Sequence, residues 1–245
     1  CVVSERILVT GGAGFIGSHI ATASESGLRL WNMQTNALEK ELPSAGGLVT
    51  RAAWSSDGGR LAIASTDAHV RLWDMKGDYL EREIAVDQDV VWSVAFSADG
   101  RQLATASGDE VVTLWDVETG AKLVSLTGHS GGATDVAFLG DGITLVVIDR
   151  VGRLHFWDVL TGRRLIEPWS AHEGTSWRIA MHPDGQRFAT AGDDGKLKIW
   201  SRAQHEPLKV FEQSIAVRGL AISSEGKLFA GERRCPDEVH GEAQG

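Results

Sequence analysis

Short runs of alternating apolar and polar residues fill most of the chain, and small turns separate them. The runs at 60–65 (RLAIAS) and 102–107 (QLATAS) are two examples, and an Asp-Gly pair precedes each of them. Alternation over four to eight residues next to Asp-Gly is typical of β-hairpins. No stretch keeps the 3.6-residue period of an amphipathic helix. The pattern therefore predicts an all-β protein.

Tryptophan recurs at a nearly constant interval, each one 42 or 43 residues after the previous one. This interval lies within the roughly 40–45 residues of a β-propeller blade, which holds four strands. The repeat predicts about five recognisable blades and a partial sixth, because the next tryptophan would fall at Glu242 in a polar tail. We therefore expect an incomplete or open ring. The tryptophans that set the interval are Trp31, Trp73, Trp115, Trp157 and Trp200.

Asp follows the tryptophan in three of these repeats, and this pair resembles the signature of the WD-repeat family. The resemblance covers residues 18–231. The sequence departs from the family's Trp-Asp pair at Trp31-Asn32 and Trp200-Ser201. It implies a WD-repeat β-propeller that acts as a rigid platform for a protein or peptide partner, usually in a closed ring of seven blades. The matching pairs are Trp73-Asp74, Trp115-Asp116 and Trp157-Asp158.

The same resemblance implies a buried hydrogen-bonded network of His, Ser or Thr, Asp and Trp in each repeat. One repeat supplies all four members, as His172, Thr190, Asp194 and Trp200. A His-Asp pair in such a network satisfies buried polar groups, so we expect a structural role rather than a catalytic one. The other repeats are partial: Thr105, Asp109 and Trp115 lack the His, whereas His129 and Trp157 have Val151 in place of the Asp. On this basis we expect the blades of Trp73, Trp115 and Trp200 to be the most stable.

A glycine-rich stretch near the N-terminus raises a different possibility. Residues 6–20 (RILVTGGAGFIGSHI) resemble the N-terminus of extended short-chain dehydrogenase/reductases, with the glycines at Gly11, Gly14 and Gly17. In that family the loop binds the pyrophosphate of a dinucleotide at a helix N-terminus. Here propeller-like sequence follows instead of a helix. The family's Tyr-x-x-x-Lys pair is also missing, because Tyr79 is the only tyrosine and Glu83 stands four residues after it, in place of the Lys.

Three interpretations of this stretch stay open: a foreign segment in place of the first strand, a divergent propeller strand, or a dinucleotide site. In register with the later blades, Gly11, Gly12 and Ala13 would correspond to Val94, Ala95 and Phe96. Glycines there would remove apolar volume and cost backbone entropy, so we expect the first blade to be the weakest.

Composition narrows the range of partners. The chain has 33 acidic and 24 basic residues, with a net charge of −9 and no dense basic run, which argues against nucleic acid. No apolar stretch is long enough for a membrane helix, so we expect no membrane partner. The two cysteines, Cys1 and Cys235, indicate no disulfide framework or metal cluster and favour a cytoplasmic location. The N-terminal Cys suggests a fragment.

We expect a non-catalytic scaffold for protein–protein interaction, or a regulatory propeller, that binds no cofactor. Either role is compatible with a place in a larger multidomain protein. The alternative is a remnant of an NAD-dependent short-chain dehydrogenase. We divide the chain into an atypical N-terminal segment (1–17), the propeller (18–231) and a disordered tail (232–245), and we expect open edge strands to permit self-association. Candidate partner-binding residues lie where the inner strands begin: Arg51, Trp92, Trp177, Arg178 and Arg218. Trp92 and Trp177 have packing between blades as an equal alternative, and the arginines would suit an acidic peptide.

Overall fold

Every element in the described part of the chain is a β-strand. The computed structural model describes residues 6–8, 19–24, 27–32, 34–43, 46–86, 89–223 and 225–231, and it contains no helix in these ranges. The all-β prediction is therefore confirmed. Alternating short apolar runs and glycine- or aspartate-containing turns explain this outcome, because they favour hairpins over helices.

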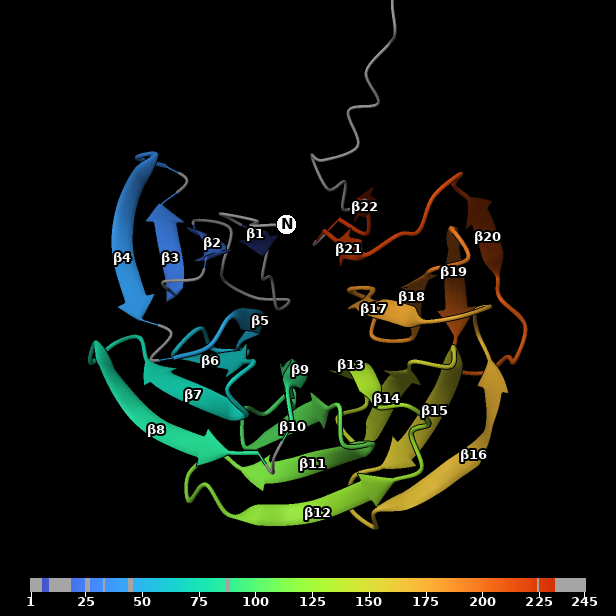
Figure 1. The fold of residues 1–245 in the computed structure, drawn as a ribbon, viewed down its shortest axis with the longest axis horizontal. Helices are drawn as coiled ribbons and strands as arrows, with labels where there is room; N and C mark the ends of the chain where they lie inside the picture. The colour runs from blue at the N-terminus through green and yellow to red at the C-terminus, as the bar shows by residue number, and fades with distance from the viewer. Residues whose placement is uncertain are drawn as a thin grey trace, which may run out of the picture.

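The strands form five four-stranded antiparallel sheets and one two-stranded sheet, each an up-and-down meander (Figure 1). The first sheet contains β1 (Arg6–Leu8), β2 (His19–Ser24), β3 (Gly27–Asn32) and β4 (Ala37–Pro43). The second contains β5 (Val49–Trp54), β6 (Arg60–Ser65), β7 (His69–Asp74) and β8 (Tyr79–Ala85). The third contains β9 (Val91–Phe96), β10 (Gln102–Ser107), β11 (Val111–Asp116) and β12 (Lys122–Thr127).

The fourth sheet contains β13 (Ala133–Phe138), β14 (Thr144–Asp149), β15 (Arg153–Asp158) and β16 (Arg163–Ser170). The fifth contains β17 (Ser176–Met181), β18 (Arg187–Gly192), β19 (Lys196–Ser201) and β20 (Lys209–Glu212). The sixth contains only β21 (Gly219–Ile222) and β22 (Leu228–Gly231). Five full blades and a partial sixth are what the tryptophan interval predicted.

The sheets stand around an arc with the first strand of each toward the centre (Figure 1). From the second sheet to the fifth, the repeat tryptophan packs on the apolar face of the preceding sheet: Trp115 shares a buried cluster with Val70 and Leu72, and Trp157 shares one with Val112 and Leu114. The core therefore lies between the sheets, and each sheet depends on its neighbours. The sixth sheet does not pair with the first in the described residues, so the sheets do not close into a ring.

The first sheet corrects the register expected for the glycine-rich stretch. Strand β1 pairs with β2 so that Leu8 lies opposite Ala21, as Ala95 lies opposite Ala104 in the third sheet. Ile7 and Leu8 thus take the inner-strand positions of Val94 and Ala95, to which we had assigned Gly11 and Gly12. The assignment was wrong because residues 9–18 connect β1 to β2, a longer connection than residues 97–101 provide. The predicted loss of apolar volume rested on that register and no longer follows.

Two further predictions concern the glycine-rich stretch and the C-terminal tail. Residues 19–24 form a strand, whereas a dinucleotide-binding loop would lead into a helix. Gly11, Gly14, Gly17 and the tail 232–245 lie outside the described residues.

Candidate partner-binding rim and buried networks

One end of the sheets gathers the predicted partner-binding residues. Antiparallel pairing brings the start of each inner strand beside the turn between the second and third strands, as Val49 beside Ser65 and Val91 beside Ser107 show. We call this end the entry rim. It comprises the inner-strand starts at 49–51, 91–93, 133–135 and 176–178, residues 217–219, and the turns 66–68, 108–110, 150–152 and 193–195.

A β-bulge opens each of the four complete inner strands of sheets two to five. The register shifts between Val49 and Arg51, and equivalent shifts occur at the starts of the next three inner strands. A bulge leaves one residue without a partner in the strand ladder and redirects its side chain. The residues so placed are Thr50, Trp92, Thr134 and Trp177.

The two threonines at bulges link neighbouring sheets. Thr50 donates its hydroxyl to the Val91 carbonyl of the third sheet, and Thr134 donates to the Ser176 carbonyl of the fifth sheet. Both threonines are buried. They therefore tie the second sheet to the third and the fourth to the fifth.

The two tryptophans at bulges instead contact arginines of the following sheet. The Arg150 guanidinium lies 4.9 Å from the centroid of the Trp92 ring, and that of Arg218 lies 4.8 Å from the Trp177 ring. Both distances suit cation–π contacts. Trp177 also donates its indole N–H to Asp193, at 2.6 Å, and Arg218 lies 3.5 Å from the same carboxylate oxygen. Each tryptophan thus packs between sheets and borders the rim at the same time.

A fully buried carboxylate, Asp135, connects the inner strands near the rim. It accepts hydrogen bonds from the Ser93 hydroxyl and, at 2.8 Å, from the Ile179 backbone N–H. Arg51 lies 3.7 Å from the same carboxylate. These partners come from the third, fifth and second sheets, so one side chain of the fourth sheet bridges all of them.

The five candidates therefore share a rim but not one cluster. Arg51 faces the buried Asp135 and is 23% exposed, whereas Arg218 is 45% exposed and pairs with Asp193. Arg178 donates to the Trp177 carbonyl at 3.1 Å. Sequence reasoning missed Asp135, although Ser93 and Asp135 lie one repeat apart, and it missed Arg150.

The buried network of the fifth sheet contains the four residues named from the sequence. His172 contacts Asp194 through Nδ1 at 2.9 Å and the Thr190 hydroxyl through Nε2 at 2.7 Å. Trp200 donates its indole N–H to the same hydroxyl oxygen at 2.8 Å. Burial lowers the pKa of His172, and the Asp194 carboxylate opposes that shift. All the polar atoms are satisfied within the network.

In the other sheets, the residue at the position of Thr190 decides whether the indole N–H of the repeat tryptophan has a hydrogen-bond acceptor. Trp31 donates to Thr22 and Trp115 donates to Thr105, both at 2.9 Å. In the second sheet Ile63 takes that position, and the Trp73 indole nitrogen is buried without a hydrogen-bond partner among the described residues. The expectation that this blade is among the most stable did not take the missing hydroxyl into account.

The fourth sheet uses a different set of residues. Val147 replaces the threonine, and Trp157 donates to Nε2 of His129 at 3.1 Å. Nδ1 of His129 lies 3.1 Å from the Glu110 carbonyl. Burial lowers the pKa of His129 to about 4, and the neighbouring His155 adds to the shift. His129 is therefore neutral and holds the indole in place of a hydroxyl.

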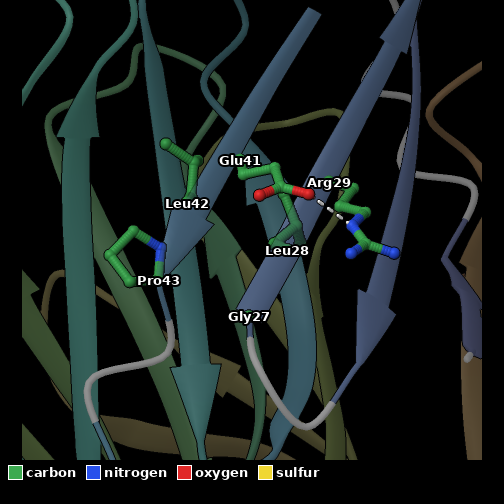
Figure 2. A pocket seen from close by; sticks show the side chains of 6 residues that line it. All are labelled: Gly27, Leu28, Arg29, Glu41, Leu42 and Pro43. Atoms are coloured by element: carbon green, nitrogen blue, oxygen red, sulfur yellow. Dashed lines mark hydrogen bonds and ion pairs between the residues drawn. The ribbon is translucent and has the colours of Figure 1, made fainter. Parts of the chain in front are cut away.

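The pocket in Figure 2 lies on the two outer strands of the first sheet, β3 and β4, at the start of β3 and the end of β4. It has a volume of about 250 Å³ and is lined by Gly27, Leu28, Arg29, Glu41, Leu42 and Pro43. The Arg29 guanidinium donates to Glu41 at 2.7 Å across adjacent strands. Its two charged side chains thus face each other, and the remaining lining residues carry no titratable side chain.

Two further searches cover the described residues. No group of three or more His, Cys, Asp or Glu side chains lies close enough together there to hold a metal ion. No helix with the length and apolar character to cross a membrane was found in that part of the chain.

Comparison with known proteins addresses the family. The family model for the WD domain, G-beta repeat (WD40), matches residues 38–74, 83–116 and 163–201. This chain contains WD40 repeats. Each match begins in the fourth strand of one sheet and ends with the third strand of the next sheet. The stretch that ends at Trp157 lies outside the three matches, and it is the repeat in which Val147 and His129 replace the usual network.

Protein HIRA of Dictyostelium discoideum is similar to part of this chain. It is 42% identical over 62 residues, which is 25% of this chain and 6% of that protein. The chain therefore matches only a small part of that relative. Both comparisons support a protein-interaction or regulatory scaffold, and neither supports the dehydrogenase resemblance of residues 6–20.

Proposed function

We propose that the entry rim of this WD40 protein binds an acidic segment of a protein partner. The observation that carries this proposal is the recurrence of arginine at the rim, with Arg51, Arg150, Arg178 and Arg218 contributed by four different sheets. Guanidinium groups bind carboxylates through paired hydrogen bonds, and Trp and Arg are enriched at binding hot spots.

The geometry of the fifth and sixth sheets supports this choice. The Arg218 side chain is 45% exposed, and its guanidinium lies 4.8 Å from the centroid of the Trp177 ring, a contact that fixes its position without covering it. An ordered arginine loses less conformational entropy on binding than a freely moving one. Asp193, 34% exposed, holds the guanidinium from one side and leaves other N–H donors for a partner carboxylate.

The proposal includes a cytoplasmic location and a non-catalytic role. It treats the propeller as a platform whose partner specificity lies in the rim, because a fold of this type hosts many functions and the site decides among them.

The experiment compares the wild-type chain with Arg218→Glu and with a matched control, Arg101→Glu. Arg101 is exposed in the turn between β9 and β10, at the opposite end of the sheets. Proteins captured by each immobilised chain are identified by mass spectrometry, and the candidates are purified and titrated against the three chains.

We expect a directly binding partner whose affinity falls at least tenfold with Arg218→Glu, stays unchanged with Arg101→Glu, and weakens with added salt. Equal affinity for all three chains would place the binding surface elsewhere. Thermal melting of both variants checks that neither change acts through unfolding.

A further inference from the structure

The histidine pair buried in the fourth sheet suggests a conformational response to acid. His129 precedes β13, and its ring centroid lies 4.8 Å from that of His155 on β15. Neither side chain is exposed to solvent. Two imidazoles this close cannot both carry a charge in a buried site without a large electrostatic cost.

The hydrogen bonds of His129 require its neutral form. The Trp157 indole can only donate, so the Nε2 atom that receives it must lack a proton. The remaining proton then lies on Nδ1 and is donated to the Glu110 carbonyl. A second proton on His129 would place two N–H donors against each other and remove the acceptor of Trp157.

The charged and titratable groups around the pair give little support to a second proton on His129. Asp149 on β14 contacts Nε2 of His155 at 2.9 Å, and its other oxygen accepts the Val151 and Arg153 backbone N–H groups. Arg164 on β16 lies 4.9 Å from the Trp157 ring centroid. The Glu110 carboxylate, on the turn of the third sheet, accepts the Gly131 N–H at 2.8 Å.

The fifth sheet offers a contrast within the same molecule. There the Thr190 hydroxyl receives the indole of Trp200, and Asp194 lies against Nδ1 of His172. The Asp194 carboxylate would stabilise a second proton on His172, and the Thr190 hydroxyl oxygen could still accept the indole. Acid should therefore disturb the fourth sheet before the fifth.

We propose that the fourth sheet is an acid-sensitive element, in which protonation of His129 breaks its contact with Trp157 and releases residues 128–132 from the turn of the third sheet. Those residues precede Thr134 and Asp135, the side chains that link the fourth sheet to its neighbours at the entry rim. Acid would thus loosen the rim at its centre. The inference stands independently of the proposed function.

The direction of the pH dependence follows from the pKa of His129. Because burial lowers this pKa from 6.5 to about 4, the neutral form is favoured in the folded state. The resulting stabilisation is complete above pH ~6.5 and decreases as the pH falls toward 4. One proton taken up on unfolding changes the unfolding equilibrium about tenfold per pH unit in this window.

The test measures urea unfolding of the full chain between pH 7 and 4.5 for the wild type, His129→Gln and His172→Gln. Glutamine can accept the Trp157 indole and does not titrate. We expect His129→Gln to remove close to one proton from the pH slope, and His172→Gln to remove distinctly less. Equal slopes in the wild type and His129→Gln would overturn the proposal.

A measurement on the wild-type chain keeps the proposal testable if His129→Gln does not fold. Nitrogen chemical shifts of the histidine rings report which nitrogen carries the proton. We expect His129 to stay neutral and protonated on Nδ1 at pH 5.5, with faster amide exchange at Gly131 and Gly132 only below that pH. Titration of His129 near pH 6.5 without any change in exchange would overturn the proposal.

Discussion

Replacement of Thr190 by valine should lower the stability of the protein far more than its small change in shape suggests. Valine has nearly the shape of threonine, and Val147 already occupies the equivalent position in the fourth sheet. The substitution therefore replaces one hydroxyl by a methyl group and keeps the branched shape of the side chain.

The loss can be estimated from the contacts of that hydroxyl. It receives the Trp200 indole at 2.8 Å and lies 2.7 Å from Nε2 of His172. Both atoms would be left buried without a partner, and each unsatisfied group costs ~1–3 kcal/mol. We expect a loss of about 3 kcal/mol, which corresponds to roughly 6–12 °C in melting temperature for a domain of this size.

Ile63→Val provides a matched control, because Ile63 takes the same strand position in the second sheet and carries no hydrogen bond. That change removes one methyl group and should cost about 1 kcal/mol. Urea unfolding and thermal melting, followed by circular dichroism, would compare the two variants. If Thr190→Val were no more destabilising than Ile63→Val, the buried network would not stabilise the sheet in the way argued above.

Two further predictions concern the links between sheets. Asp135→Asn should destabilise the chain by about 2–4 kcal/mol, because Arg51 loses its buried carboxylate and the amide cannot accept all the same hydrogen bonds; urea unfolding checks this, and a loss no greater than that of Ser93→Ala would contradict it. Gly152→Ala should cost more than Gly142→Ala by at least ~1 kcal/mol: both glycines have positive φ, +82° and +72°, but a Cβ at Gly152 would lie 2.5 Å from the Gly174 carbonyl oxygen, whereas one at Gly142 meets nothing within 4 Å. Equal melting temperatures for the two glycine variants would show that the backbone can move aside.

The tryptophan interval predicted the sheets well because one repeat corresponds to one structural unit. The fifth-sheet network could also be named from the sequence, since His172, Thr190, Asp194 and Trp200 all stand at the family's positions. The unpaired indole of Trp73 was not foreseen, because the residue that decides its hydrogen bond, Ile63, stands ten residues earlier and was not considered.

Other features could not be read from a single repeat. Asp135 is satisfied by groups from three other sheets, so its role depends on the arrangement of the repeats around the arc. His155 occupies a strand position that holds Thr113 in the third sheet, and its contact with Asp149 follows from strand pairing. The register of residues 6–8 was missed because the connection after them is longer than in the other sheets.

The position of Asp135 has a consequence for the order in which parts of the molecule open. Its hydrogen bonds and ion pair join the second, third, fourth and fifth sheets through a group that is nowhere exposed, whereas Arg218 reaches the fifth sheet through a half-exposed side chain. Opening of the central sheets would expose this carboxylate's partners together, while the sixth sheet can separate at a smaller cost. Local fluctuations should therefore begin at the sixth sheet, and the four sheets joined by Asp135 should open as one cooperative unit.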